Sequence, residues 1–346
     1  MEPAAATASN QPAGVGECTM STLRKLLTGT LLSGAIALSS ASAGLAADAD
    51  HKEEWAKFKI QFLIWTAEGV PFFAPALEGA KDAAAQQGVN IDIQFGGSNV
   101  ANQNTIHETA IASGVNGILT TIWDDEGFDG VLCKAKEKGI AVMAYNIDDS
   151  KGAPGTCRMA FMGQNFVETG YALGQRMIKD HGLKKGDLVF TPVEFPNAVY
   201  AQLRHAGVKK AMDEIGATTE ILGTDTDSAN ALNLMTQYLV GHPETKAVIG
   251  LGLTPTSQAV RAIKDAGLKI PAGGYDVSPE VIKDIKDGTL TATVDQQPYS
   301  QGFYAVTQMA LYLKYGLYPS EMATGGAGLI DKTNTDKAEV WAGKTR

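Results

Sequence analysis

The sequence predicts an α/β protein with two lobes, each built on a parallel β-sheet. Short apolar runs alternate with amphipathic runs of about 12 to 16 residues, which is the pattern of strands alternating with helices. Such alternation is typical of parallel sheets whose two faces are covered by helices. Ten apolar runs are many for one open sheet, and 346 residues with 44% apolar side chains suffice for two cores.

The predicted strands, in chain order, are 59–65, 90–95, 117–122, 141–146, 159–163, 187–192, 219–224, 247–252, 272–276 and 290–296. The predicted helices include an alanine-rich run directly after Phe73, followed by 101–114, 128–139, 166–182, 198–216, 231–243 and 255–267. Several of these helices end at glycine, which commonly stops a helix. The alternation fails in the helix-free segment 147–158, so we expect the first crossing between lobes near Gly163 and Gln164.

The N-terminal region has the composition of a secretory signal. Arg24 and Lys25 precede the apolar run "LLTGTLLSGAIALSS", which ends in the small-residue string "ASAGLAADAD". The apolar run is too short to span a membrane comfortably. We therefore expect residues 1–47 to be a cleaved signal peptide with an upstream extension, and the mature protein to be periplasmic.

Composition and motif spacing argue against nucleic-acid binding and against catalysis. The 38 acidic residues exceed the 29 basic ones, giving a formal net charge of −9, and no basic stripe is interleaved with aromatics. The Gly-Lys-Thr at 343–345 lacks the first glycine of a phosphate loop, because Ala338 stands there. His107 lacks the second histidine of a zinc protease helix. We expect a protein that is not an enzyme and that needs neither a cofactor nor a metal ion.

The cysteines leave two alternatives open. Cys18 lies in the predicted leader, so Cys133 and Cys157 are the two that remain after export. In an oxidising compartment they could form a disulfide, whose loop of about 24 residues would be worth roughly 3 kcal/mol. Two buried, inert thiols are the other reading.

Polar and aromatic side chains follow the carboxyl ends of the predicted strands, the edge at which open α/β sheets bind ligands. A sugar hydroxyl both donates and accepts hydrogen bonds, while the C–H face of the ring packs on an aromatic plane, so this mixture favours a polyhydroxylated ligand. The residues are Phe72 and Phe73 after the first strand, Trp123, Asp124 and Asp125 after the third, Asn146 after the fourth, Asp276 after the ninth, Gln296 after the tenth, and Arg204 on a helix.

Each of these residues also has a structural reading. One phenylalanine of the pair could simply pack in the core, and Trp123 could cap a core. Asp124 and Asp125 could stabilise the start of the next helix, since acidic side chains favour helix N-termini. Arg204 could be a solvated helix residue, and Asp276 could cap a loop.

Five short motifs follow one another along the chain: "PFF" at 71–73, "GQN" at 163–165, "QLRHAG" at 202–207, "GGYDVSPEV" at 273–281 and "ATVDQQP" at 292–298. In this order they resemble the periplasmic sugar-binding proteins of ABC importers, of the ribose-binding type. The resemblance extends from about Lys59 to about Tyr318. It implies two Rossmann-like lobes, joined by three hinge strands, that close on a sugar.

The resemblance assigns lobe boundaries and roles. It implies an N-terminal lobe of 57–162 and 297–325 and a C-terminal lobe of 163–296 and 326–346. The aromatic pair would sandwich the ring, and the polar residues would bind its oxygen atoms. The implied ligand set is Phe72 and Phe73 as the pair, Asn146 where ribose binders carry an aspartate, Arg204 as the helix arginine, Asp276, Gln296 at the second hinge, and Asp124 and Asp125 in a polar loop.

The chain departs from ribose binders at several of these positions. Thr254 is the polar residue nearest to the place of their asparagine after the eighth strand, and Thr226 replaces an aromatic. Ile147 or Asp148 stands where they have a second arginine, and Trp123 replaces a smaller residue. The resemblance therefore implies a pentose, hexose or related polyol other than ribose.

The expected function is that of a solute-binding protein which delivers a monosaccharide or polyol to the transmembrane subunits of an ABC permease, and the expected state is a monomer. Two alternatives stay open. A periplasmic sensor that feeds a chemoreceptor or a sensor kinase would share every site residue. A sugar-modifying enzyme would need an acid–base pair, which Asp124 and Asp125 could supply.

Overall fold

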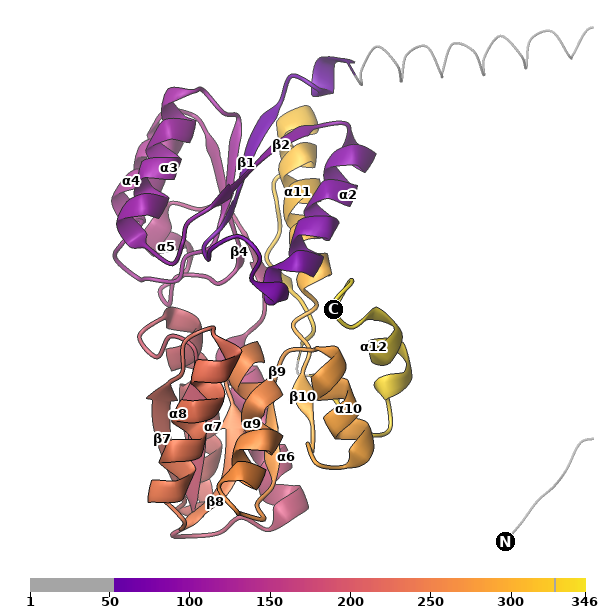
Figure 1. Ribbon diagram of the computed structural model, residues 1–346. Helices are drawn as coiled ribbons and strands as arrows, with labels where there is room; N and C mark the ends of the chain where they lie inside the picture. The colour runs from indigo at the N-terminus through magenta and orange to yellow at the C-terminus, as the bar shows by residue number, and fades with distance from the viewer. Residues whose placement is uncertain (1–52, 327) are drawn as a thin grey trace, which may run out of the picture. The chain divides into compact units, whose positions relative to one another are not determined.

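Two six-stranded sheets organise the computed structural model, which describes residues 53–326 and 328–346 (Figure 1). Their strand orders are β11-β5-β4-β3-β1-β2 in sheet A and β12-β10-β9-β8-β6-β7 in sheet B. Both belong to one compact unit, Glu54–Arg346. The predicted signal peptide, 1–47, lies outside the described residues.

Sheet A is parallel throughout, and helices cover both of its faces (Figure 1). Its strands are β1 (Lys59–Ile64), β2 (Asn90–Phe95), β3 (Gly117–Thr120), β4 (Ala141–Asn146), β5 (Phe161–Gly163) and β11 (Met322–Ala323). The helices of this lobe are η1 (Pro71–Phe73), α2 (Ala74–Gln87), α3 (Val100–Ala112), α4 (Asp129–Glu137), α5 (Ala153–Thr156) and α11 (Pro298–Tyr315).

Sheet B is parallel except for its last strand, β12, which pairs antiparallel with β10. Its strands are β6 (Leu188–Val193), β7 (Thr218–Gly223), β8 (Thr245–Gly250), β9 (Ala272–Tyr275), β10 (Thr293–Val294) and β12 (Leu329–Ile330). Its helices are α6 (Phe166–His181), α7 (Val199–Ile215), α8 (Ser228–Gly241), α9 (Leu253–Asp265), α10 (Pro279–Asp287) and α12 (Thr335–Trp341).

Within the described residues the chain passes between the sheets three times: between β5 and α6, between β10 and α11, and between β11 and β12. The predicted fold class is thereby confirmed. The exact lobe boundaries at 162/163, 296/297 and 325/326 remain a prediction.

The structure corrects the sequence reading in detail. The segment 147–158 was expected to be free of helix, but its Ala-Pro-Gly-Thr stretch forms the one-turn helix α5. The strand expected over 290–296 is paired only at Thr293 and Val294, because the following residues form the second crossing. Helices α10, α11 and α12 and strands β11 and β12 were not among the predicted elements.

Side-chain caps explain where several helices begin. Asn99, Asn165, Asp227 and Ser278 each accept a hydrogen bond from the backbone N–H three residues ahead, which satisfies a donor that the helix itself leaves unpaired. Glycines with positive φ stand just after the ends of α2, α6, α7, α10 and α11, as expected for helix stops.

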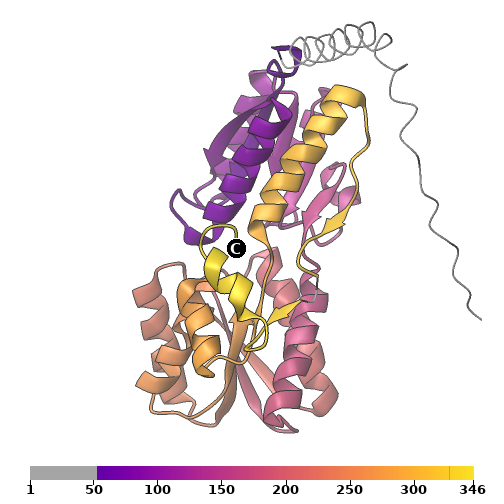
Figure 2. The ribbon, with the colours of Figure 1, turned by 90° about the vertical axis from the view of Figure 1, so that its right-hand side faces the viewer.

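Helices α2 and α11 pack closely on one face of sheet A, although they are far apart in sequence (Figure 2). The contact depends on two glycines. A Cβ built on Gly302 would lie 2.0 Å from the carbonyl oxygen of Ala76, and a Cβ on Gly79 would lie 2.1 Å from the carbonyl oxygen of Tyr299. Helix α11, which directly follows the second crossing, thus packs against α2, the helix that follows the aromatic pair.

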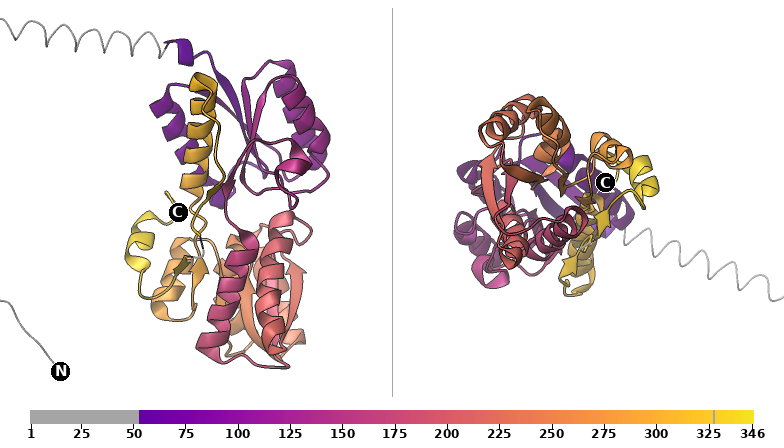
Figure 3. Two further views of the ribbon diagram at one scale, coloured as in Figure 1. Left: turned by 180° about the vertical axis from the view of Figure 1, so that it is seen from behind. Right: turned by 90° about the horizontal axis from the view of Figure 1, so that it is seen from below.

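Helices α6 and α7 form the corresponding pair beside sheet B (Figure 3). Helix α6 starts at Phe166, directly after the first crossing, and α7 carries Arg204 among its buried residues. This packing brings the Phe166 ring within 4.6 Å of the Arg204 guanidinium carbon. Among the described residues, no helix combines the length and the apolar character that a membrane span requires.

The structure pairs Cys133 with Cys157 in a disulfide. Cys133 lies on α4 and Cys157 directly follows α5, so the bond ties the segment between β4 and β5 to its covering helix. The bond resolves the alternative between a disulfide and two buried thiols.

Replacing both Cys133 and Cys157 with alanine should lower the free energy of unfolding by about 3 kcal/mol, because the unfolded chain gains the freedom of a loop. The two residues are 24 apart in sequence. Urea denaturation of the oxidised protein and the double variant measures the effect. Reduction should lower the midpoint of the wild type and leave the variant unchanged; a wild type insensitive to reduction would contradict the prediction.

Candidate functional site

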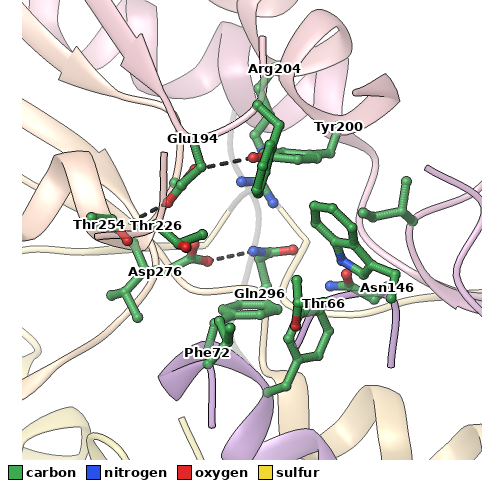
Figure 4. A pocket seen from close by; sticks show the side chains of 17 residues that line it. Thr66, Phe72, Asn146, Glu194, Tyr200, Arg204, Thr226, Thr254, Asp276 and Gln296 are labelled. Atoms are coloured by element: carbon green, nitrogen blue, oxygen red, sulfur yellow. Dashed lines mark hydrogen bonds between the residues drawn. The ribbon is translucent and has the colours of Figure 1, made fainter. Parts of the chain in front are cut away.

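A cavity lies where the two lobes meet, and both lobes and one crossing segment line it (Figure 4). Its walls come from loops at the carboxyl ends of parallel strands and from the starts of α7 and α9. The lining residues are Trp65, Thr66, Val70, Phe72, Phe73, Asn146, Ile147, Glu194, Phe195, Tyr200, Arg204, Thr226, Gly252, Leu253, Thr254, Asp276 and Gln296.

The structure brings seven of the ten predicted ligand residues to this cavity. They come from segments spread over more than two hundred residues, and they meet because parallel strands end at the same edge of each sheet. These seven are Phe72, Phe73, Asn146, Arg204, Thr254, Asp276 and Gln296.

Trp123, Asp124 and Asp125 are not among the lining residues. Trp123 donates its indole N–H to the Gln103 side-chain oxygen at 2.9 Å, and its ring centre lies 5.2 Å from that of Trp65. Asp124 accepts hydrogen bonds from two backbone N–H groups of its own loop, and Asp125 accepts from the N–H and hydroxyl of Ser150. Local backbone N–H groups therefore hold the Asp124 carboxylate, and Ser150, 25 residues further along the chain, holds that of Asp125, so none of these three residues lines the cavity.

The aromatic pair is held by a short, stiff turn. Gly69 adopts a φ of +86°, which favours glycine, and Pro71 begins the 3₁₀ turn η1. Phe73 is buried and Phe72 half-buried. Their ring centres lie 4.9 Å apart at 86°, an edge-to-face contact. Because the two rings touch each other, they leave no space for a ligand ring between them, so the expected sandwich is wrong for this arrangement.

Arg204 is a buried residue of the cavity wall, which excludes the reading of a solvated helix residue. Its Nη1 donates to the carbonyl oxygen of Leu251 at 2.7 Å. The guanidinium carbon lies 4.3 Å from the ring centre of Tyr275 and 4.9 Å from that of Tyr200. Cation–π contacts and a fixed hydrogen bond thus set the orientation of its planar head.

Asp276 and Gln296 form a buried pair beside it. The Gln296 amide donates to the Asp276 carboxylate at 2.5 Å, and Asp276 adopts a φ of +73° directly after β9. Burial raises the pKa of Asp276 to about 6, although the charge of Arg204 and the hydrogen bond from Gln296 both act to lower it.

The free energy of unfolding should depend on pH because of Asp276. Its pKa rises from 3.8 to about 6 on folding, so the folded state binds more protons between these values. Without ligand, the free energy of unfolding should therefore fall as the pH rises from about 4 to about 6. Denaturant titrations at several pH values should give a flatter dependence for Asp276→Asn, whereas identical pH profiles would contradict the assignment.

Asn146 lines the opposite wall and connects it to the crossings. It has a φ of +64° at the end of β4, and its side-chain N–H donates to the Gln301 side-chain oxygen at 3.0 Å. Gln301 in turn donates to the carbonyl oxygen of Gln296 and to the hydroxyl of Thr324. One buried network therefore joins the cavity to two of the three crossing segments.

Sequence reasoning missed a group of lining residues around the end of β6. Glu194 and Phe195 directly follow this strand, and Tyr200 lies on the first turn of α7. Burial raises the pKa of the Glu194 carboxyl. The predicted strand stops at Pro192, whereas β6 continues to Val193, so only the structure places "EF" directly at the carboxyl end of a strand, like the other candidates.

The cavity thus offers donors, acceptors and aromatic surface. Several buried polar atoms on its lining residues have no hydrogen-bond partner, namely the Trp65 indole N–H, the Arg204 Nε–H and the Gln296 amide oxygen. Unpaired buried polar atoms are costly, so a ligand that pairs with them gains affinity. Among the described residues, no group of three or more His, Cys, Asp or Glu side chains is arranged to hold a metal ion.

Comparison with known proteins gives a match over most of the chain. Residues 61–317 match the model of the periplasmic binding protein domain. The xylose/arabinose-binding protein of Sulfolobus acidocaldarius is 29% identical over 273 residues, which cover 74% of this chain and 67% of that protein. The D-ribose/D-allose-binding protein of Pseudomonas aeruginosa is 28% identical over 301 residues, which cover 84% and 93%.

Solved structures show the same arrangement. A carbohydrate transporter from Acidothermus cellulolyticus, in complex with myo-inositol, superposes with a TM-score of 0.76 at 25% identity, covering 84% of this chain and 99% of that one. A solute-binding protein from Burkholderia graminis, in complex with D-arabinose, has a TM-score of 0.74 at 24% identity, covering 82% and 98%. The second likeness supports the fold alone.

Proposed function

Because this chain belongs to the periplasmic binding protein family, we propose that it captures a monosaccharide or a related polyol in the cavity between its lobes. One observation carries the proposal: an aromatic pair, a buried arginine and a buried acid–amide pair converge on one cavity from distant parts of the chain. These residues are Phe72, Phe73, Arg204, Asp276 and Gln296.

The proposed binding mode divides apolar and polar contacts between the walls. The apolar C–H face of the ligand packs on one ring of the Phe72–Phe73 pair, whose rings meet edge to face, and this contact excludes water from the hydrogen bonds nearby. The Arg204 Nε–H donates to a ligand hydroxyl, and the Gln296 amide oxygen accepts from one. The Asp276 carboxylate, which already accepts from the Gln296 amide, also accepts from ligand hydroxyls. Asn146 completes the polar set from the other lobe.

The proposed mechanism is closure about the three crossing segments. A ligand that touches residues of both lobes binds the closed arrangement more tightly than the open one, and only this difference can shift the equilibrium. The closed form would then present a surface of both lobes to the transmembrane subunits of an ABC permease. The protein would act in the periplasm, as its family name and the expected signal peptide indicate.

The relatives support the ligand class. Their names specify xylose or arabinose in one case and ribose or allose in another, and one structural neighbour is a carbohydrate transporter solved with myo-inositol. Pentoses, hexoses and cyclitols are therefore the first compounds to test.

A thermal-shift screen of aldoses, ketoses, linear polyols and cyclitols, followed by calorimetry on each hit, tests the proposal. A ligand at a hundredfold excess over its Kd stabilises the folded state by about 2.7 kcal/mol, so a true ligand raises the melting temperature. Asp276→Ala should abolish the shift, and the exposed Tyr304→Ala should leave it unchanged. The proposal fails if no small polyol shifts the wild-type melting temperature.

Recovery of the ligand separates binding from catalysis. A radiolabelled sugar released from the protein by denaturation should be chemically unchanged after prolonged incubation. A converted product would favour the sugar-modifying enzyme instead.

A further inference from the structure

Glu194 is a carboxylate of the cavity wall that the proposed binding mode does not use. It is 8% exposed and lies directly after β6. One of its oxygens accepts from the backbone N–H of Thr254 at 3.0 Å, at the start of α9, and the other accepts from the Tyr200 hydroxyl at 3.1 Å. A Cβ on Gly252 would lie 2.0 Å from this carboxylate, so the absence of a side chain there makes room for it.

The charged side chains that line the cavity do not balance. Among the described residues they are two carboxylates, Glu194 and Asp276, against the single guanidinium of Arg204. That guanidinium already donates to a backbone carbonyl and lies against three aromatic rings. An unbalanced buried carboxylate is costly, and a ligand that brings a positive charge removes the cost.

The remaining walls suit a cation as well. Trp65, Phe72, Phe73 and Phe195 surround the cavity with aromatic surface, and aromatic faces attract ammonium groups. Gln296 is 1% exposed and its amide oxygen has no partner; Figure 4 shows this oxygen on the side of the amide away from Asp276. An ammonium carries three N–H donors and no acceptor, so it suits a wall that offers a carboxylate, and it brings no acceptor of its own that would be left unpaired.

We propose that the ligand of this cavity is a polyol that carries a protonated amine, an amino sugar or an aminocyclitol, and that Glu194 receives the ammonium group. The inference rests on the proposed function and deepens it, because it names the chemical class within the sugars and polyols. Glu194 then determines specificity, while Arg204, Asp276 and the aromatic pair bind the features that neutral and amino ligands share.

Matched pairs of ligands test the inference in the wild-type protein. Calorimetry at neutral pH compares D-glucose with D-glucosamine, D-galactose with D-galactosamine, and myo-inositol with its monoamino derivative. In at least one pair the amine should bind about tenfold or more tightly than the neutral partner, the ratio expected of a charge-assisted hydrogen bond. The N-acetyl derivative, which keeps the nitrogen but loses the charge, should lose this gain.

The Glu194→Gln variant tests whether Glu194 causes the tighter binding of the amine. The variant should bind amine and neutral partner within about twofold of each other, whereas Glu214→Gln, at an exposed glutamate on α7, should keep the wild-type ratio. If Glu194→Gln does not fold, the wild-type comparison of charged and acetylated ligands decides alone.

The outcomes separate the two proposals. If neutral partners bind at least as tightly as amines in every pair, the amine inference is overturned and the proposed function stands. An amine preference that persists in Glu194→Gln overturns the role of Glu194. If neither neutral nor amino compounds bind, the proposed function fails and the inference fails with it.

Discussion

Replacing Arg204 with methionine should lower the free energy of unfolding by about 3 kcal/mol or more and abolish measurable binding of the proposed ligand. Methionine fills much of the space but leaves Glu194 and Asp276 buried without their cation, and removal of one partner from buried charges is among the costliest substitutions. The Leu251 carbonyl loses its donor as well. Urea denaturation and calorimetry measure the two effects.

The loss should also depend on pH. Arg204 acts to lower the pKa of both carboxyls, so both pKa values rise further without it, and the destabilisation grows as the pH rises and the groups ionise. Arg261→Met, at an exposed arginine on α9, is the control and should change stability by about 0.5 kcal/mol or less. Equal stabilities of the two variants would contradict the role given to Arg204.

Gly302→Ala should destabilise the protein by roughly 3 kcal/mol, because the added methyl group would overlap the backbone of α2 and force the helices apart. Its Cβ would lie 2.0 Å from the Ala76 carbonyl oxygen, which cannot move without the whole helix. Gly130→Ala on α4 is the matched control, since nothing lies within 4 Å of its Cβ. That change should be neutral or stabilise by up to about 1 kcal/mol, because alanine has a higher helix propensity than glycine.

The denaturant midpoints of Gly302→Ala and Gly130→Ala test this difference in stability. A Gly302→Ala protein as stable as Gly130→Ala would show that α2 and α11 can separate without cost. The close approach of these helices would then contribute little to the position of the second crossing.

The fold was largely predictable because alternating apolar and amphipathic runs indicate alternating strands and helices, which is the pattern of parallel sheets. The resemblance to sugar-binding proteins of ABC importers, identified from five short motifs, is confirmed by the family to which the chain belongs. The sequence pattern could not predict the short edge strands Met322–Ala323 and Leu329–Ile330, because two residues show no periodicity. The disulfide depended on the distance between Cys133 and Cys157, which sequence does not contain.

The candidate site was predictable where a residue directly follows a strand. Asn146, Asp276 and Gln296, at or just after the ends of β4, β9 and β10, line one cavity, as the convergence of strand ends suggested. Arg204 lines it too, but from helix α7. Asp125 follows a strand too, but its partner Ser150 is 25 residues further along the chain, and only the folded loop shows that the carboxylate is already engaged. Glu194 was missed because the proline before Val193 reads as a strand end, whereas β6 continues through it.

The order of the strands also bears on how the protein can be made. Sheet A receives β11 and its covering helix α11 from residues beyond 297, and sheet B receives its edge strand β12 still later. A nascent chain therefore cannot complete either half until nearly all of it has been synthesised. Until then the partly formed sheets keep unpaired strand edges, so slow folding and mispairing of edges are the characteristic risks of this chain order.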